Sequence, residues 1–170
     1  VKLSKRTGKT ITLNELIDDV GVNASRYFFA SKSLDTQMDF DLDLAVKNSN
    51  DNPVYYIEYA NARISSILRK QDCDVVDTFG TIDNELAYTI VKKLIMFEDV
   101  VVSAAARELP HLIANYLYEL AGLFHSYYSS EKIVTEDSIY TKEHIALIKA
   151  IKIVMNNAAN LIGIILREEM

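Results

Sequence analysis

The 170-residue chain contains one cysteine, no tryptophan, two prolines and five glycines. A single cysteine cannot form an internal disulfide, which excludes the disulfide-stapled secreted class and favours a reducing, cytoplasmic compartment. The scarcity of glycine and proline leaves long uninterrupted segments, as a helical protein requires. No apolar run approaches the roughly 18 residues of a membrane span, so we expect no membrane partner.

The charge balance is acidic, with 24 Asp and Glu against 18 Lys and Arg, a formal charge of −6. Nucleic-acid binding by bulk electrostatics scales with the number of phosphates neutralised, and an acidic chain is poorly suited to it. The apolar share of 49% excludes a disordered protein. Any contact with nucleic acid must therefore be local.

Apolar residues recur mostly at helical spacing, which predicts an all-α fold. Thr12 and Glu15 have capping-box spacing before a short helix that Gly21 ends, and Asn23 can cap a second short helix. Further helices are expected over residues 53–70, from Asp83, over 98–108, from Pro110, and from Thr141 to about Ile162. We predict an antiparallel helical bundle preceded by a short irregular helical appendage, with the boundary at residues 49–52.

The first candidate site is the basic N-terminal segment, which contains Lys2, Ser4, Lys5 and Arg6. Cations, hydroxyls and a nearby glycine are groups that can hold polyphosphate. A solvated, frayed terminus explains the same composition. The segment is not a P-loop, because Leu3 stands where that motif requires glycine.

The second candidate is a stripe at the start of the helix expected from residue 53. Tyr56, Tyr59 and Arg63 are spaced i, i+3 and i+7, so they share one face. Such a face can stack unpaired RNA bases. Spacing alone also fits a core position, but Ile57 and Ile64 belong to another row that already supplies a buried face. The tyrosines are therefore expected at its edge.

Residues of catalytic type are scattered elsewhere. His111, His125 and His144 have no partners at metal-ligand spacing, and Cys73 lies in no recognisable nucleophile pattern. The sequence therefore predicts no metal site.

Several ordered motifs resemble class I arginyl-tRNA synthetases over essentially the whole chain. The most specific, Asn-Pro-Val-Tyr-Tyr-Ile-Glu-Tyr-Ala-Asn-Ala-Arg-Ile over 52–64, is similar to the family pattern N-P-V-Y-Y-V-Q-Y-A-H-A-R-I. The opening Lys-Leu-Ser-Lys-Arg over 2–6 resembles the signature K-M-S-K-S, and residues 110–121 and 167–170 also match. Residues 145–149, Ile-Ala-Leu-Ile-Lys, keep the family's D-A-L-R motif only loosely.

The resemblance implies three parts: a signature loop over 1–12, stem-contact helices over 13–51, and a DALR-type anticodon-binding bundle over 52–170. In the full enzyme the loop would bind ATP with Mg²⁺, and Lys2 and Lys5 would stabilise the departing pyrophosphate. The residues implied at the ATP site are Lys2, Ser4, Lys5 and Arg6.

The bundle would receive the anticodon loop of an arginine tRNA. The residues implied at this surface are Tyr56, Tyr59, Arg63 and Met170. Glu58 and Asn61 stand where the family commonly has Gln and His.

The resemblance also implies a catalytic domain that this chain lacks. We therefore expect a cytoplasmic, monomeric part of a longer arginine–tRNA ligase that binds tRNA but needs no cofactor and is inactive alone. The alternative is a helical protein-interaction module with a disordered basic N-terminal tail.

Overall fold

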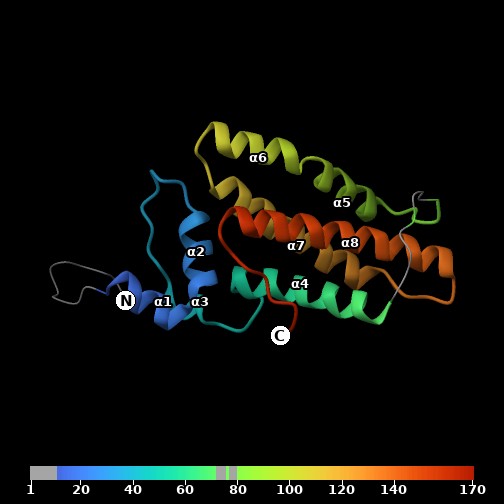
Figure 1. Ribbon diagram of the computed structural model, residues 1–170, viewed down its shortest axis with the longest axis horizontal. Helices are drawn as coiled ribbons and strands as arrows, with labels where there is room; N and C mark the ends of the chain where they lie inside the picture. Colours follow the sequence, from blue (N-terminus) through green and yellow to red (C-terminus); the bar gives the residue numbers. More distant parts are fainter. Residues whose placement is uncertain (1–10, 72–75, 77–79) are drawn as a thin grey trace.

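The computed structural model describes residues 11–71, 76 and 80–170, and these residues form helices and loops without a strand. The all-α prediction is confirmed. In Figure 1 the long helices lie lengthwise beside one another, and the short helices near the N-terminus lie at one end of them. The helices are α1 (Leu13–Val20), α2 (Val22–Ala30), α3 (Leu42–Ala45), α4 (Pro53–Lys70), α5 (Glu85–Ile95), α6 (Phe97–Ala106), α7 (His111–Ser130) and α8 (Ser138–Leu161).

The appendage begins with the expected capping box. The Thr12 hydroxyl accepts from the Glu15 backbone N–H, and the Glu15 carboxylate accepts from the Thr12 N–H at 2.7 Å. Gly21 ends α1 with φ = 83°, a conformation that favours glycine. The expected cap at Asn23 is wrong: α2 starts at Val22. The Asn23 side chain instead makes tertiary hydrogen bonds, which sequence proximity does not reveal.

The bundle begins at the predicted Asn52–Pro53 pair. The Asn52 side-chain oxygen accepts from the Val54 N–H at 3.0 Å, and Pro53 occupies the first helical turn. The Asn52 amide also donates to the carbonyl oxygens of Ala45 and Lys47. One buried side chain therefore caps α4 and fixes the end of the appendage against it.

Two other helix starts differ from the sequence expectations. Asn84, not Asp83, caps α5, because its side-chain oxygen accepts from the Ala87 N–H. The last helix starts at Ser138, three residues before Thr141, because Asp137 provides a cap. Short polar side chains compete for the cap position, and the sequence alone does not decide between neighbours.

The long helices of the bundle alternate in direction, as Figure 1 shows by its colours. Helices α4 and α7 run one way, and α8 and the consecutive helices α5 and α6 run the other. Helix α7 packs against α4, α5, α6 and α8. Among the described helices, none is both long enough and apolar enough to cross a membrane. Among the described residues, the largest side chains with almost no exposure are Tyr127, Phe124, Ile57, Ile64, Ile90, Leu117, Leu120, Ile145, Ile148, Ile151, Met155 and His144.

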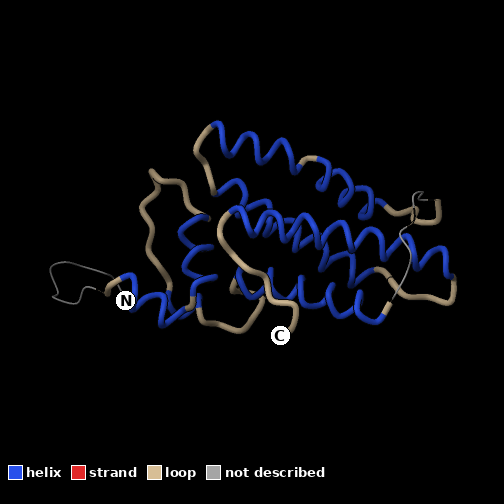
Figure 2. Tube along the Cα trace, viewed as in Figure 1, coloured by secondary structure: helices blue, strands red, loops and turns tan. Residues whose placement is uncertain are grey.

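After α8 the chain turns at Gly163, which has φ = 74°. Residues 163–170, here called the C-terminal strap, return toward α4 as the last loop in Figure 2. The Asn61 side chain in α4 donates to the Arg167 carbonyl at 2.8 Å. The strap thereby places Met170 beside α4.

Candidate nucleic-acid interface

The centre of the site is Arg63 of α4. Its guanidinium carbon lies 4.5 Å from the ring centroid of Tyr59 and 4.4 Å from that of Tyr128 in α7. The guanidinium also donates a hydrogen bond to the Tyr59 hydroxyl. Two cation–π contacts hold a charged group that would otherwise sample many rotamers. The site is thus ordered before any ligand arrives.

An open pocket of about 480 Å³ lies over this arrangement, lined in part by Tyr59, Arg63, Tyr128 and Met170. Met170 comes from the strap and is 55% exposed. Charged side chains complete the wall: Arg69, Lys70, Glu168 and Glu169. A pocket lined by aromatic rings and charged side chains can receive a flat heterocycle attached to a charged backbone.

Tyr56 does not line this pocket. It is half-buried, and its ring centroid lies 4.3 Å from that of His125 and 5.4 Å from that of Tyr118. His125 is in turn stacked on Tyr59, with centroids 5.7 Å apart and planes at 20°. Tyr56 therefore contacts the site through His125.

His125 is held in its neutral form. Burial lowers the pKa of the His125 imidazole, and the nearby Arg63 charge lowers it further. Its Nε2–H donates to the Tyr56 carbonyl at 3.0 Å, a bond that opposes the shift without reversing it. At neutral pH the ring is thus an aromatic surface and not a second cation.

Sequence reasoning missed the contribution of α7. Tyr118, His125 and Tyr128 lie seven and three residues apart on the side of α7 that meets α4. Their i, i+7 and i+10 spacing was a usable signal, since it matches one helical face. The sequence did not predict that this face of α7 packs against the Tyr59 and Arg63 stripe of α4.

Tyr55 extends the aromatic surface along α4. Its ring lies parallel to that of Tyr59, with centroids 6.1 Å apart and planes at 14°. The i, i+4 spacing makes this stack a property of the helix itself.

The strap is fastened beside the pocket by polar contacts. Lys152 of α8 bonds Glu168 at 2.7 Å, and Arg69 of α4 lies 3.3 Å from Glu169. Asn61, which holds the Arg167 carbonyl, itself accepts from the Asn156 amide at 3.0 Å. The position of Met170 therefore depends on both α4 and α8.

The other predicted site is the basic N-terminal segment, for which the structure gives no description. Lys2, Ser4, Lys5 and Arg6 lie outside the described residues. Within the ranges that the structure describes, no group of three His, Cys, Asp or Glu side chains is positioned to hold a metal ion.

The described part of the chain is thus an antiparallel helical bundle with a candidate binding pocket where α4 packs on α7. Comparison with known proteins makes this more specific. Residues 57–170 match the DALR anticodon binding domain family. The chain belongs to this family.

Relatives that match the whole chain are named arginine–tRNA ligases. Those from Staphylococcus epidermidis and Geobacillus thermodenitrificans are 46% and 47% identical over 100% of this chain and 32% of their own length. The chain thus spans about a third of the relatives it matches. A solved chain described as an arginyl-tRNA synthetase from Campylobacter jejuni has a TM-score of 0.87 at 29% identity, covering 98% of this chain and 37% of its own. The resemblance to arginyl-tRNA synthetases is confirmed.

Proposed function

We propose that this chain binds the anticodon loop of an arginine tRNA as part of an arginine–tRNA ligase. One observation carries the proposal: Arg63 is fixed between the rings of Tyr59 and Tyr128. Together with Met170, these three residues line a pocket of about 480 Å³. Membership of the anticodon-binding family supports it.

The chemistry of the pocket fits an unpaired nucleotide better than a duplex. Aromatic rings stack single bases, at about 1–3 kcal/mol per base, and paired bases do not offer their faces. Arg63, Arg69 and Lys70 supply positive charge at this site although the chain has a net charge of −6. These cations can contact the phosphates that flank a stacked base.

The activity of the longer protein is part of the same proposal. The matching relatives are named arginine–tRNA ligases, and such a ligase would join arginine to its tRNA with ATP and Mg²⁺. Lys2, Ser4, Lys5 and Arg6 would contact ATP only with the rest of that protein present. We propose that it works as a cytoplasmic monomer, where tRNA and ATP are available.

The test is binding of the 170-residue chain to an arginine tRNA transcript, beside the same transcript with a changed anticodon, over a salt series. We expect selective binding that weakens steeply as salt rises, since phosphate contacts release counterions. Binding that ignores both the anticodon and the salt concentration would favour the protein-interaction module instead.

A further inference from the structure

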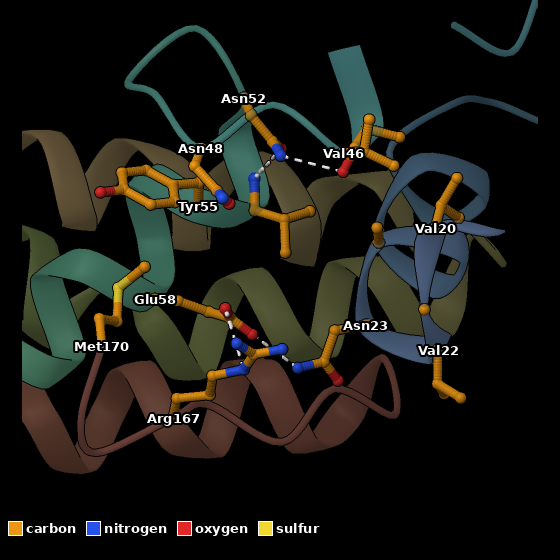
Figure 3. A pocket seen from close by; sticks show the side chains of 14 residues that line it. Val20, Val22, Asn23, Val46, Asn48, Asn52, Tyr55, Glu58, Arg167 and Met170 are labelled. Carbon is orange, nitrogen blue, oxygen red and sulfur yellow. Dashed lines mark hydrogen bonds and ion pairs between the residues drawn. The ribbon is translucent and has the colours of Figure 1, made fainter. Parts of the chain in front are cut away.

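Two pockets of about 370 Å³ each do not include Arg63. The first lies between α2, the start of α4 and the strap, and Figure 3 shows Glu58 and Arg167 at its centre. Nε of Arg167 lies 3.6 Å from Oε2 of Glu58, and the Asn23 amide donates to Oε1 at 2.7 Å. The charges of this pocket therefore neutralise each other within the chain.

The second pocket lies between α6 and α7, which run antiparallel, and is here called the α6–α7 groove. Asp99, Ser103 and Arg107 line it from α6 at a spacing of four residues, so they share one helical face. Asn115 and Tyr116 line it from α7. The volume is within the range of small-ligand sites.

One part of the groove is already fixed by contacts within the chain. The Lys93 ammonium pairs with Glu119 and lies 4.8 Å from the ring centroid of Tyr116. The Tyr116 hydroxyl donates to the Lys93 carbonyl at 2.8 Å, and Tyr116 is only 2% exposed. These three residues therefore form an ordered wall whose two charges cancel.

The remaining charges that line the groove are Asp99 and Arg107, and neither has an ion-pair partner among the residues that the structure describes. They lie eight residues apart on α6, about 12 Å along the helix axis, so they cannot pair with each other. A ligand must bridge less than this distance, because long side chains lean toward the N-terminus of their helix and Arg107 follows Asp99. The groove thus presents an anion and a cation in line.

The backbone next to Arg107 is held in a strained conformation. Glu108 has φ = 55°, in the left-handed region that favours glycine. The Leu109 N–H donates to the Ala104 carbonyl at 2.9 Å, which completes a Schellman motif at the end of α6. Such strain persists where the surrounding structure fixes it, and it is common at ligand sites. The turn thus fixes the backbone position of Arg107 beside the start of α7.

The groups along the groove match the two ends of an elongated zwitterion. A guanidinium binds a carboxylate through two parallel N–H donors, and the Ser103 hydroxyl is a further donor in the groove. The Asn115 side chain has both a donor and an acceptor, so it can also bond an α-ammonium group. The Asp99 carboxylate accepts from a cationic group.

We propose that the α6–α7 groove binds a linear basic amino acid, whose carboxylate contacts Arg107 and whose cationic tail contacts Asp99. The inference goes beyond the proposed function. The groove shares no lining residue with the pocket beside Arg63, so a ligand here leaves that pocket open.

The test is calorimetric titration of the 170-residue chain with three ligands. L-arginine is the probe, L-citrulline keeps its shape without the charge of the tail, and L-argininamide lacks the carboxylate. We expect the wild type to bind L-arginine at least about ten-fold more tightly than either analogue, since each loses a hydrogen bond between charged groups.

Two variants separate the ends of the site. Asp99→Asn should bind L-arginine and L-citrulline almost equally and still discriminate against L-argininamide. Arg107→Ala should lose the second discrimination and keep the first. Asp39→Asn is the matched control and should keep both, because Asp39 is an exposed carboxylate in the loop before α3, outside the groove.

Three results would overturn the site. The first is a wild type that does not bind L-arginine or binds all three ligands equally. The second is retention of both discriminations in Asp99→Asn and Arg107→Ala, since arginine would then bind elsewhere. The third is equal weakening toward every ligand in both variants, since Asp99 and Arg107 would then be structural. The tRNA titration is a separate measurement, so failure of the proposed function remains distinguishable.

Discussion

At the scale of single residues, the site depends on how Arg63 is restrained. A free arginine loses rotamer entropy on binding, and the Tyr59 and Tyr128 rings remove part of that cost beforehand. Each cation–π contact contributes about 0.5–2 kcal/mol. Tyr59 also stacks on Tyr55 and His125, so its ring contacts three of the side chains that form the aromatic and basic surface of the site.

Replacing Tyr59 with alanine should weaken binding of the arginine tRNA transcript by about 1–3 kcal/mol, the range of one base–aromatic stack. Helicity should hardly change, because Tyr59 lies at the edge of the core and is half-buried. Direct titration together with circular dichroism measures both quantities.

Tyr59→Phe is the control. It keeps the ring and removes only the hydroxyl that accepts from Arg63, so most of the affinity should remain. If Tyr59→Ala instead unfolds the bundle, the side chain belongs to the core and the stacking assignment fails.

At the scale of elements, α8 anchors the chain that leads into α5. The buried Glu143 carboxylate accepts from the backbone N–H groups of Gly80, Thr81 and Ile82 and from the Thr81 hydroxyl. Burial raises the pKa of Glu143, but these hydrogen bonds outweigh burial and lower the pKa to about 2. One side chain of α8 thus fixes a segment about sixty residues earlier.

Because the folded-state pKa of Glu143 lies below its ordinary 4.5, the carboxylate stabilises the fold above about pH 4.5 and loses this effect as the pH falls toward 2. Glu143→Gln should lower the free energy of unfolding at pH 7 by about 1–2 kcal/mol. Its stability should also depend less on pH in this acid range. Urea unfolding at several pH values tests both expectations.

The exposed Glu119→Gln substitution is the comparison for Glu143→Gln, and it should leave stability nearly unchanged. An acid transition as steep in Glu143→Gln as in the wild type would contradict the assignment.

At the scale of the whole molecule, α7 and α8 share a polar contact inside the core. A hydrogen bond joins the Tyr127 hydroxyl to Nδ1 of His144, and Tyr140 packs against the same imidazole with centroids 4.0 Å apart. Burial lowers the pKa of His144, although Glu131 and Glu143 oppose the shift. The neutral ring therefore belongs to the native packing.

Stability should consequently fall as the pH drops below about 6.5, because the unfolded chain protonates His144 before the folded chain does. One such histidine contributes at most about 1.4 kcal/mol per pH unit. His144→Asn, which can still bond Tyr127, should flatten the dependence between pH 7.5 and 5.5. Thermal unfolding over that range measures it.

The flattening should be partial, because burial also lowers the pKa of His125. An unchanged slope in His144→Asn would show that His144 does not account for the loss of stability.

The sequence alone determined most local structure in this protein. The capping box at Thr12, the turn at Gly21 and the start of α4 at Asn52 depend on residues within four positions of each other, and all three were predicted correctly. The sequence likewise predicted that Tyr56, Tyr59 and Arg63 share one face, because helical geometry fixes which side chains lie together at i, i+3 and i+7. The resemblance to arginyl-tRNA synthetases needed only ordered motifs.

Only the tertiary structure decided which distant groups meet. Asn23 looked like a helix cap, yet its side chain bonds Glu58 and the strap. Those partners lie 35 and 142 residues away along the chain, so no local pattern predicts the bonds. Tyr128 was not linked to Arg63, since that contact exists only where α7 packs on α4. Spacing along one helix predicts a face, but burial and pairing depend on the elements that pack against it. Their approach formed the pocket beside Arg63 and the pocket between α2, α4 and the strap.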